Sequence, residues 1–256
     1  MITLKKPAEV VKMRKSGQVV ADIHKAIRDV IKPGVDTLTL DEVAESVLAR
    51  ESAKASFKGY RTFGARTPFP SAICVSVNEE VVHGMPSRNR VLSEGDIVSI
   101  DVGAQVDGYH GDAACTYPVG RISPEREKLL CVTRKALYIG IEKAASGNTI
   151  GDIGYVIEQW VLGEGCGLVR DYAGHGIGRK LHEPPQVPNH GQPGCGLTIR
   201  PGLTFCIEPM VMSGQEAVES RDNGWTVVTC DGSDAAHFEH TILITEDGAE
   251  ILTPWE

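Results

Sequence analysis

Two aspartates eleven positions apart, Asp101 and Asp112, are the first residues whose spacing suggests chemistry. They lie in the stretch DIVSIDVGAQVDGYHGDA, on either side of Asp107-Gly108, a dipeptide typical of a two-residue β-hairpin loop. With that loop, Gly103 faces Asp112, and Asp101 points to the same face as Gly103 because side chains alternate along a strand. The two carboxylates are then diagonal neighbours, roughly 7–8 Å apart or less at Cβ, a separation that suits convergence on a cation.

The residues around Asp101 are apolar, so the hairpin is expected to be partly buried. Buried carboxylates are normally paired with a counter-charge or bound to a metal. The alternative is a polar sheet face that carries two solvated aspartates, and the hairpin alone leaves both interpretations open.

Three further residues of metal-ligand type lie in the second half of the chain. They are His175 in GHGIG, Glu208 in FCIEPM and Glu239 in HFEHT. The glycines beside His175 would let the backbone pass close to a bound group. The two glutamates are expected inside short apolar strands, where a carboxylate needs compensation. For each residue alone, a paired core acid or a satisfied histidine is the alternative.

Two histidines stand apart from these carboxylates, His83 before Gly84-Met85-Pro86 and His182 before Glu183-Pro184-Pro185. The other histidines are assigned a structural or surface role by default: His24, His110, His190, His237 and His240. His237 is the least secure of these assignments, because it lies two residues before Glu239 on the same expected strand face.

The elements that would position these residues follow a repeated order. Helical spacing of apolar residues predicts helices over 7–30, 124–145 and 150–163. Another helix is predicted to begin at about Thr39, which forms a capping-box pattern with Glu42. Strands are expected over 72–77, 81–82, the Asp101 hairpin, 203–211, 224–230 and 239–244. The same order of elements occurs in IKPGVDTLTLDEVAESV and in AASGNTIGDIGYVIEQW: a helix, a break that contains glycine, a threonine and a second helix. We therefore predict an α+β domain over 1–256, with antiparallel sheets, pseudo-repeat halves of about 7–120 and 124–254, and a site between them.

Composition narrows the class of protein. The 256 residues are 41% hydrophobic and 23% charged, with a net charge of −8 and no basic run, which argues against nucleic acid or an anionic membrane as a partner. No apolar run approaches the roughly 18 residues of a membrane span, and the start has no apolar stretch like that of a signal peptide. The seven cysteines are scattered without a C-x-x-C pair, which favours a reducing cytoplasm over a disulfide framework or structural zinc.

Six blocks carry a family resemblance. In chain order they are VVHGMP, IDVGAQVDGYHGDAA, GHGIGRKLHEPP, TFCIEPM, NGWTV and FEHT, and they span some 160 residues. With these blocks the chain resembles the type I methionine aminopeptidases over nearly its full length. The resemblance implies the pita-bread α+β fold, whose two halves are related by a pseudo-twofold axis. It also implies that five residues bind two metal ions: Asp101, Asp112, His175, Glu208 and Glu239.

The same resemblance implies an activity. The protein would remove the initiator methionine from nascent polypeptides and prefer a small second residue. Glu208 would move the proton of the attacking water, and His83 and His182 would lie on the substrate side. Four carboxylates and one imidazole favour Mn, Fe, Co or Zn as the divalent ions. We expect a cytoplasmic monomer that meets nascent peptide N-termini, with the ribosome as a further candidate partner and no membrane or nucleic-acid readout.

Methionine would need a narrow apolar pocket, since thioether–aromatic contacts are mildly favourable. By position in the family pattern, the candidates are Phe57, Tyr60, Phe69, Cys74, Leu181 and Trp225. The alternative for each is an ordinary core position. Two departures from the family pattern concern this pocket: RTFGAR over 61–66 resembles an insertion, and Leu181 stands where the family often has an aromatic residue.

Several other classes fit less well. Proline-directed peptidases of this fold typically carry a large additional N-terminal domain, and type II methionine enzymes carry an insertion between the last two glutamates. Here Glu208 and Glu239 are only 31 positions apart. A non-catalytic binding module would be expected to lose ligands. The chain also lacks the G-x-x-x-x-G-K-[ST], G-x-S-x-G and H-E-x-x-H motifs.

Overall fold

The computed structural model describes residues 2–61 and 67–256. Along this part of the chain, helices occur in two pairs, α1 (Pro7–Arg28) with α2 (Thr37–Arg50) and α3 (Pro124–Lys143) with α4 (Ile150–Gly163). A set of strands follows each pair, so the repeated order predicted from the sequence is present. The strands are β1 (Lys54–Ala55), β2 (Ile73–Val77), β3 (Glu80–Val82), β4 (Ile97–Val106), β5 (Tyr109–Pro118), β6 (Gly167–Leu168), β7 (Gly174–Gly176), β8 (Glu183–Val187), β9 (Thr204–Ile207), β10 (Met210–Met212), β11 (Val218–Ser220), β12 (Val227–Thr229), β13 (Ala235–His237), β14 (His240–Thr245) and β15 (Gly248–Ile251).

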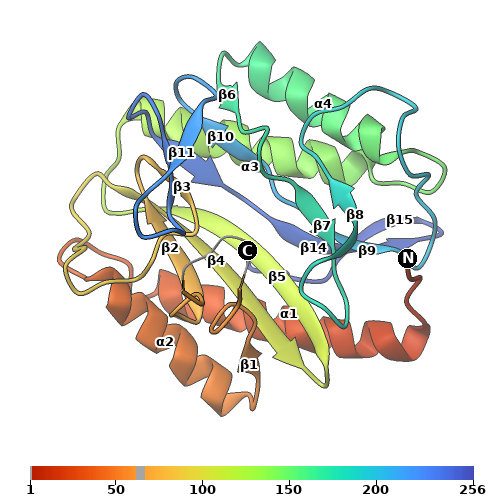
Figure 1. The fold of residues 1–256 in the computed structure, drawn as a ribbon, viewed down its shortest axis with the longest axis horizontal. Helices are drawn as coiled ribbons and strands as arrows, with labels where there is room; N and C mark the ends of the chain where they lie inside the picture. The colour runs from red at the N-terminus through yellow and green to blue at the C-terminus, as the bar shows by residue number, and fades with distance from the viewer. Residues whose placement is uncertain (1, 62–66) are drawn as a thin grey trace.

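The sheets lie between the two helix pairs, with α1 and α2 on one side and α3 and α4 on the other (Figure 1). In the first half, β4 pairs with β1, β2 and β5, and in the second half the order is β15-β14-β9-β7-β8. Two small sheets, β13-β10-β6 and β11-β12-β3, complete the arrangement. Strand β12 of the second half pairs with β3 of the first, so the halves share a sheet. The predicted α+β class, with antiparallel sheets covered by helices, is confirmed.

The hairpin that carries both aspartates forms as predicted. Val106 pairs with Tyr109, and Asp107 and Gly108 have φ values of 51° and 79°, the left-handed conformations that a tight I′-type loop requires. Gly103 pairs with Asp112, and Asp101 pairs with Ala114. Asp101 and Asp112 are therefore diagonal neighbours on one hairpin.

The second helix begins earlier than the sequence suggested. Its N-cap is Asp36, whose side chain accepts a hydrogen bond of 3.0 Å from the Thr39 backbone N–H. The Thr39 hydroxyl also donates to Asp36, at 2.9 Å, so it is not free to cap the helix. The predicted Thr39–Glu42 capping box is wrong, because an aspartate three residues earlier accepts the Thr39 backbone N–H.

The two glutamates lie outside the strands in which they were expected. Glu208-Pro209 separates β9 from β10, which belong to different sheets, since a proline has no N–H for a ladder. In the same way, Glu239 lies between β13 and β14, which also belong to different sheets. Both glutamates therefore lie where the chain passes from one sheet to another, and not inside strands as predicted.

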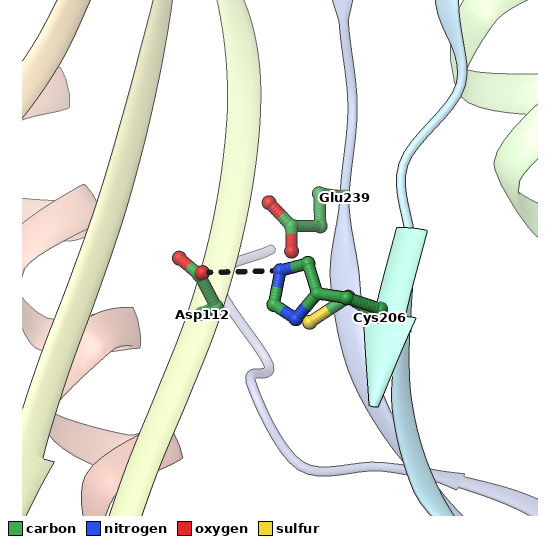
Figure 2. A group of neighbouring side chains, drawn as sticks. Asp112, Cys206 and Glu239 are labelled. Atoms are coloured by element: carbon green, nitrogen blue, oxygen red, sulfur yellow. Dashed lines mark ion pairs between the residues drawn. The ribbon is translucent and has the colours of Figure 1, made fainter. Parts of the chain in front are cut away.

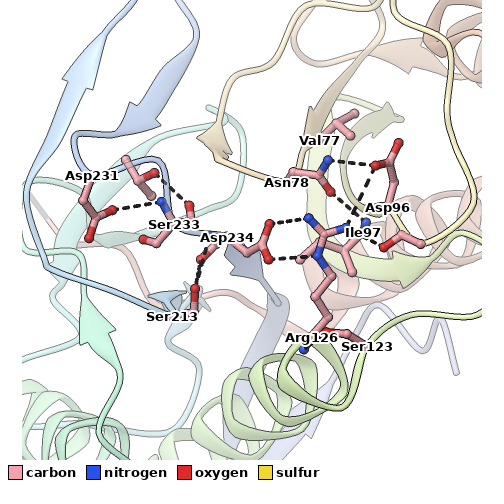
Figure 3. Close-up of polar contacts among 12 residues, drawn as sticks. Val77, Asn78, Asp96, Ile97, Ser123, Arg126, Ser213, Asp231, Ser233 and Asp234 are labelled. Carbon is pink, nitrogen blue, oxygen red and sulfur yellow. Dashed lines mark hydrogen bonds and ion pairs between the residues drawn. The ribbon is translucent and has the colours of Figure 1, made fainter.

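Arg126 on α3 ties three segments together (Figure 3). Its Nε and Nη2 donate to the two carboxylate oxygens of Asp234, at 2.8 and 2.6 Å, and its Nη1 donates to the backbone carbonyl of Gly95. Asn78 donates to Asp96 at 2.8 Å and accepts from the Ile97 N–H at 3.0 Å. The start of β4 and the segment before β13 are thereby held beside α3.

Within the described ranges, none of the helices combines the length and the apolar character that crossing a membrane requires.

Candidate metal centre

A cavity of about 540 Å³ lies between the two halves and is lined by side chains from both. The five residues expected as metal ligands all line it: Asp101 on β4, Asp112 on β5, His175 on β7, and Glu208 and Glu239 at the two sheet crossings. The structure therefore brings together residues that lie as far apart as 138 positions in the chain, Asp101 to Glu239.

His175 presents a lone pair to two carboxylates. Its Nδ1 lies 3.0 Å from the carbonyl of Gly176, an acceptor, so Nδ1 carries the hydrogen and Nε2 carries the lone pair. Nε2 lies 3.7 Å from Asp112 Oδ2 and 3.7 Å from Glu208 Oε1 (Figure 2 shows the contact with Asp112). Burial lowers the pKa of His175 to about 3, so the ring is neutral and these contacts are not ion pairs. Electron-pair donors that face one another in this way suit a shared cation.

Among the residues that the structure describes, the carboxylates are only partly compensated. One oxygen each of Asp101, Asp112 and Glu239 is buried without a hydrogen-bond partner there. Burial raises the pKa of Asp101 to about 7. Burial, followed by repulsion from neighbouring carboxylates, raises the pKa values of Asp112, Glu208 and Glu239 well above their usual range. Divalent ions would offset this repulsion, so the residues present fit a metal centre.

Cys206 lies beside these residues but is a poor candidate ligand. One donor atom each of Asp112, His175, Cys206 and Glu239 lies within 4.8 Å of the others (Figure 2). The sulfur, however, also lies 3.4 Å from Thr241 Oγ1, whose own hydrogen goes to the Asp112 carbonyl. The thiol therefore supplies the hydrogen of that contact. Burial, and then the charges of Glu239 and Asp112, raise the pKa of Cys206 well above its usual value. A metal would need the thiolate, so Cys206 is outside our ligand set.

His83 and His182 line the same cavity. His83 has a φ of 58°, a left-handed conformation that is uncommon outside glycine and is often found at functional sites. Its ring lies 5.7 Å from Tyr172 and 6.4 Å from Trp225, centroid to centroid. His182 shares a 2.5 Å hydrogen bond between its Nδ1 and the Tyr60 hydroxyl, and its ring lies 4.3 Å from that of His175. Burial lowers both pKa values, that of His83 to about 4, so both rings are neutral near pH 7.

The residues expected to form the methionine pocket also line the cavity, and they are Phe57, Tyr60, Phe69, Cys74, Leu181 and Trp225. Phe69 and Trp225 meet edge to face at 5.2 Å, and the Trp225 Nε1–H donates to the Thr67 carbonyl at 3.0 Å. These contacts give the cavity an apolar wall. Of the segment that resembles an insertion, residues 62–66 lie outside the described part of the chain.

Two residues that line the cavity were not predicted from the sequence. His237 was assigned a structural role, yet it lines the cavity with its Nε2 3.9 Å from Glu208 Oε2. Its place two residues before Glu239 was the available signal. Tyr172 also lines the cavity and was not singled out. By contrast, His24 is buried against Tyr117 and Ala113, and His240 stacks on Trp255 at 4.7 Å, in agreement with structural roles.

Glycine is required on both sides of His175 for a different reason from the one expected. A Cβ at Gly174 would lie 2.3 Å from the Cys206 carbonyl oxygen, and one at Gly176 would lie 2.2 Å from the Pro184 carbonyl oxygen. The neighbouring backbone, and not a bound group, excludes side chains there. Close packing of the flanking chain around β7 therefore fixes the position of His175.

We expect metal affinity to rise with pH. Protons and metal ions compete for the same oxygens, and burial raises the pKa of Asp101 to about 7. Below pH 7, the association constant for the metal should fall by about tenfold for each unit by which the pH falls and for each proton that the metal must displace. Calorimetric titration of metal-free protein with Mn(II) at pH 6, 7 and 8 measures this. Equal affinity at the three pH values would contradict the protonation states given above.

The chain matches the model of metallopeptidase family M24 over residues 11–246. It is 49% identical to methionine aminopeptidase 1 of Bacillus subtilis over 253 residues, 99% of each chain. It is 48% identical to the methionine aminopeptidase of Clostridium acetobutylicum, again over 99% of each.

The solved structures agree. The crystal structure of methionine aminopeptidase from Thermotoga maritima superposes with a TM-score of 0.95 at 47% identity, covering 99% of each chain. Prolidase from Pyrococcus furiosus superposes with a TM-score of 0.76 at 21% identity and shares the fold, over 99% of this chain and 66% of that one. These matches confirm the predicted pita-bread fold.

Proposed function

From the premise that the chain belongs to metallopeptidase family M24 and is a metalloaminopeptidase, we propose that it removes the initiator methionine from nascent polypeptides at a centre of two divalent ions. The observation that carries the proposal is the convergence of four carboxylates and one neutral imidazole on one cavity, with Asp112 and Glu239 buried and Asp101 and Glu208 half-buried. An apolar wall that includes Phe69 and Trp225 adjoins them, where a methionine side chain would lie.

The proposed ligands are Asp101, Asp112, His175, Glu208 and Glu239. An oxygen-rich set with one imidazole favours Mn, Fe, Co or Zn over soft-metal centres. When bound, two such ions would lower the pKa of water and polarise the scissile carbonyl. Burial, and then mutual repulsion, raise the pKa values of Asp112, Glu208 and Glu239. This repulsion favours two cations over one, because four negative charges then meet four positive ones.

Glu208 is the proposed proton carrier. It would take the proton of the attacking water and pass it to the leaving amine. It lies at a sheet crossing, with one oxygen 3.7 Å from His175 Nε2 and the other 3.9 Å from His237 Nε2. Both of its oxygens therefore face the cavity, as a group that exchanges protons with a substrate requires.

His83 and His182 are the proposed hydrogen-bond donors to the substrate. A neutral imidazole carries one N–H, which can stabilise the negative charge that develops on the carbonyl oxygen or hold the leaving nitrogen. The Tyr60 hydroxyl occupies His182 Nδ1 at 2.5 Å, so Nε2 is the nitrogen left to face a substrate. This pair would orient the first peptide bond without adding charge to the site.

We propose nascent peptide N-termini as the substrates and, for that reason, a cytoplasmic location. We propose a preference for a small second residue, because that side chain would lie at the rim of the cavity. A peptide panel tests this proposal. Met-Ala peptides should be cleaved faster than Met-Lys peptides, and Ala-Pro peptides should not be cleaved.

The outcomes of this panel separate the alternatives. Cleavage of Ala-Pro in preference to Met-Ala would indicate a proline-directed peptidase of the same fold. No cleavage of any peptide by metal-loaded protein would contradict the proposed activity altogether.

A further inference from the structure

The seam between the two halves runs along β5 and residues 237–241. Strand β5 pairs with β4 along one edge, and its other edge faces the second half. Three contacts cross this seam in an antiparallel register, joining 112 to 241, 114 to 239 and 116 to 237. The middle contact is a direct backbone hydrogen bond, from the Glu239 N–H to the Ala114 carbonyl, at 2.9 Å.

At one end, a threonine side chain takes the place of the opposite backbone. Thr241 Oγ1 accepts the Asp112 backbone N–H at 3.0 Å and donates to the Asp112 carbonyl at 2.8 Å. Thr241 is fully buried, so water cannot replace either bond. The hydroxyl thus binds both backbone polar groups of a proposed metal ligand.

At the other end, the same arrangement occurs with the halves exchanged. Thr116 Oγ1 on β5 accepts the His237 backbone N–H at 2.9 Å and donates to the His237 carbonyl at 2.9 Å. Ser99 lies 2.8 Å away and, because the Thr116 hydrogen is already used, donates its own. Asp112 and Thr116 are four residues apart, as are His237 and Thr241. The seam is therefore built symmetrically from two D/H-x-x-x-T segments.

We propose that Thr241 and Thr116 are positioning residues of the metal centre. Their hydroxyls lie between the two strands and fix the separation of the halves, so that Asp112 and Glu239 meet across the seam. Without a hydroxyl, the Asp112 N–H and carbonyl would be buried without partners, which costs free energy until the strands shift. This inference rests on the proposed function, because it assigns Asp112 and Glu239 to metal binding.

Thr241→Val tests the inference, since valine has the same shape but no hydroxyl. We expect metal-free Thr241→Val to bind Co(II) about 10–100-fold more weakly than wild type, the range found for groups that orient metal ligands. The visible absorption spectrum of the bound cobalt should also change. Thr241→Ser keeps the hydroxyl and should restore both the affinity and the spectrum.

Thr133→Val is the matched control. Thr133 is equally buried, and its hydroxyl donates to the Leu129 carbonyl at 2.7 Å within α3. Its loss should lower the melting temperature without weakening Co(II) binding. Thr116→Val tests the same claim from the other end of the seam. If Thr241→Val does not fold, the result for Thr116→Val decides the question.

Different results would overturn the positioning role of the threonines and the proposed function. Wild-type affinity and spectrum in folded Thr241→Val, or in folded Thr116→Val if Thr241→Val does not fold, would overturn the positioning role and leave the metal centre intact. A wild-type protein that binds no Co(II) at the cavity would overturn the proposed function itself.

Discussion

Asp112→Asn is expected to lower kcat by on the order of 10³-fold or more, because it removes a ligand from the centre that activates water. The same change should stabilise the metal-free protein by about 1 kcal/mol or more. In the folded chain Asp112 must either ionise beside Glu239 and Asp101 or take up a proton, and both states cost free energy at pH 8. An amide avoids that cost. Steady-state kinetics with a Met-Ala peptide and thermal unfolding of chelated protein measure the two effects.

Asp41→Ala provides the contrast. Asp41 is also buried, but its carboxylate accepts the backbone N–H groups of Ala72 and Ile73 at 2.8 and 3.1 Å. Removal of this acceptor leaves two buried N–H groups without it, so the change should lower stability and leave metal binding in place. If Asp112→Asn retained turnover, or destabilised the metal-free protein as Asp41→Ala should, Asp112 would be an ordinary structural acid.

Arg126→Ala is expected to lower the free energy of unfolding by about 2–3 kcal/mol. Its guanidinium bridges Asp234 with two hydrogen bonds and binds the Gly95 carbonyl (Figure 3). These contacts hold the segment before Glu239 beside the start of β4, in a site where the side chains are only 22% and 25% exposed. Urea unfolding of the two proteins measures the difference.

Arg170→Ala is the matched control for this prediction. Arg170 also contacts two carboxylates, those of Glu158 and Glu216, at 2.8 and 2.9 Å, but its side chain is 39% exposed. Exposed pairs contribute about 0–1 kcal/mol. A loss at Arg126 no larger than the loss at Arg170 would show that the bridge does not hold the halves together.

Local signals in the sequence predicted much of the fold. Asp107-Gly108 specified a two-residue loop, and the register of the Asp101 hairpin followed from it. Thr149 and Asp152 form a capping box at the start of α4, where the helix was expected to begin. Such signals act within a few residues, so one chain is enough to interpret them.

Where prediction failed, distant contacts decided the outcome. Glu208 and Glu239 were placed inside strands, because apolar neighbours look alike in a strand and at a crossing between sheets. His237 was assigned a structural role, although the fold brings its Nε2 within 3.9 Å of Glu208. Nothing local in the sequence indicates that Thr241 binds the backbone of a residue 129 positions earlier.

Diffraction from crystals grown with Mn(II), recorded for its anomalous signal, would show where this protein binds metal. We expect two ions in the cavity between the halves, bound by Asp101, Asp112, His175, Glu208 and Glu239. Ions bound elsewhere, with these five side chains left without a metal in a protein that still cleaves Met-Ala, would contradict the proposed metal centre.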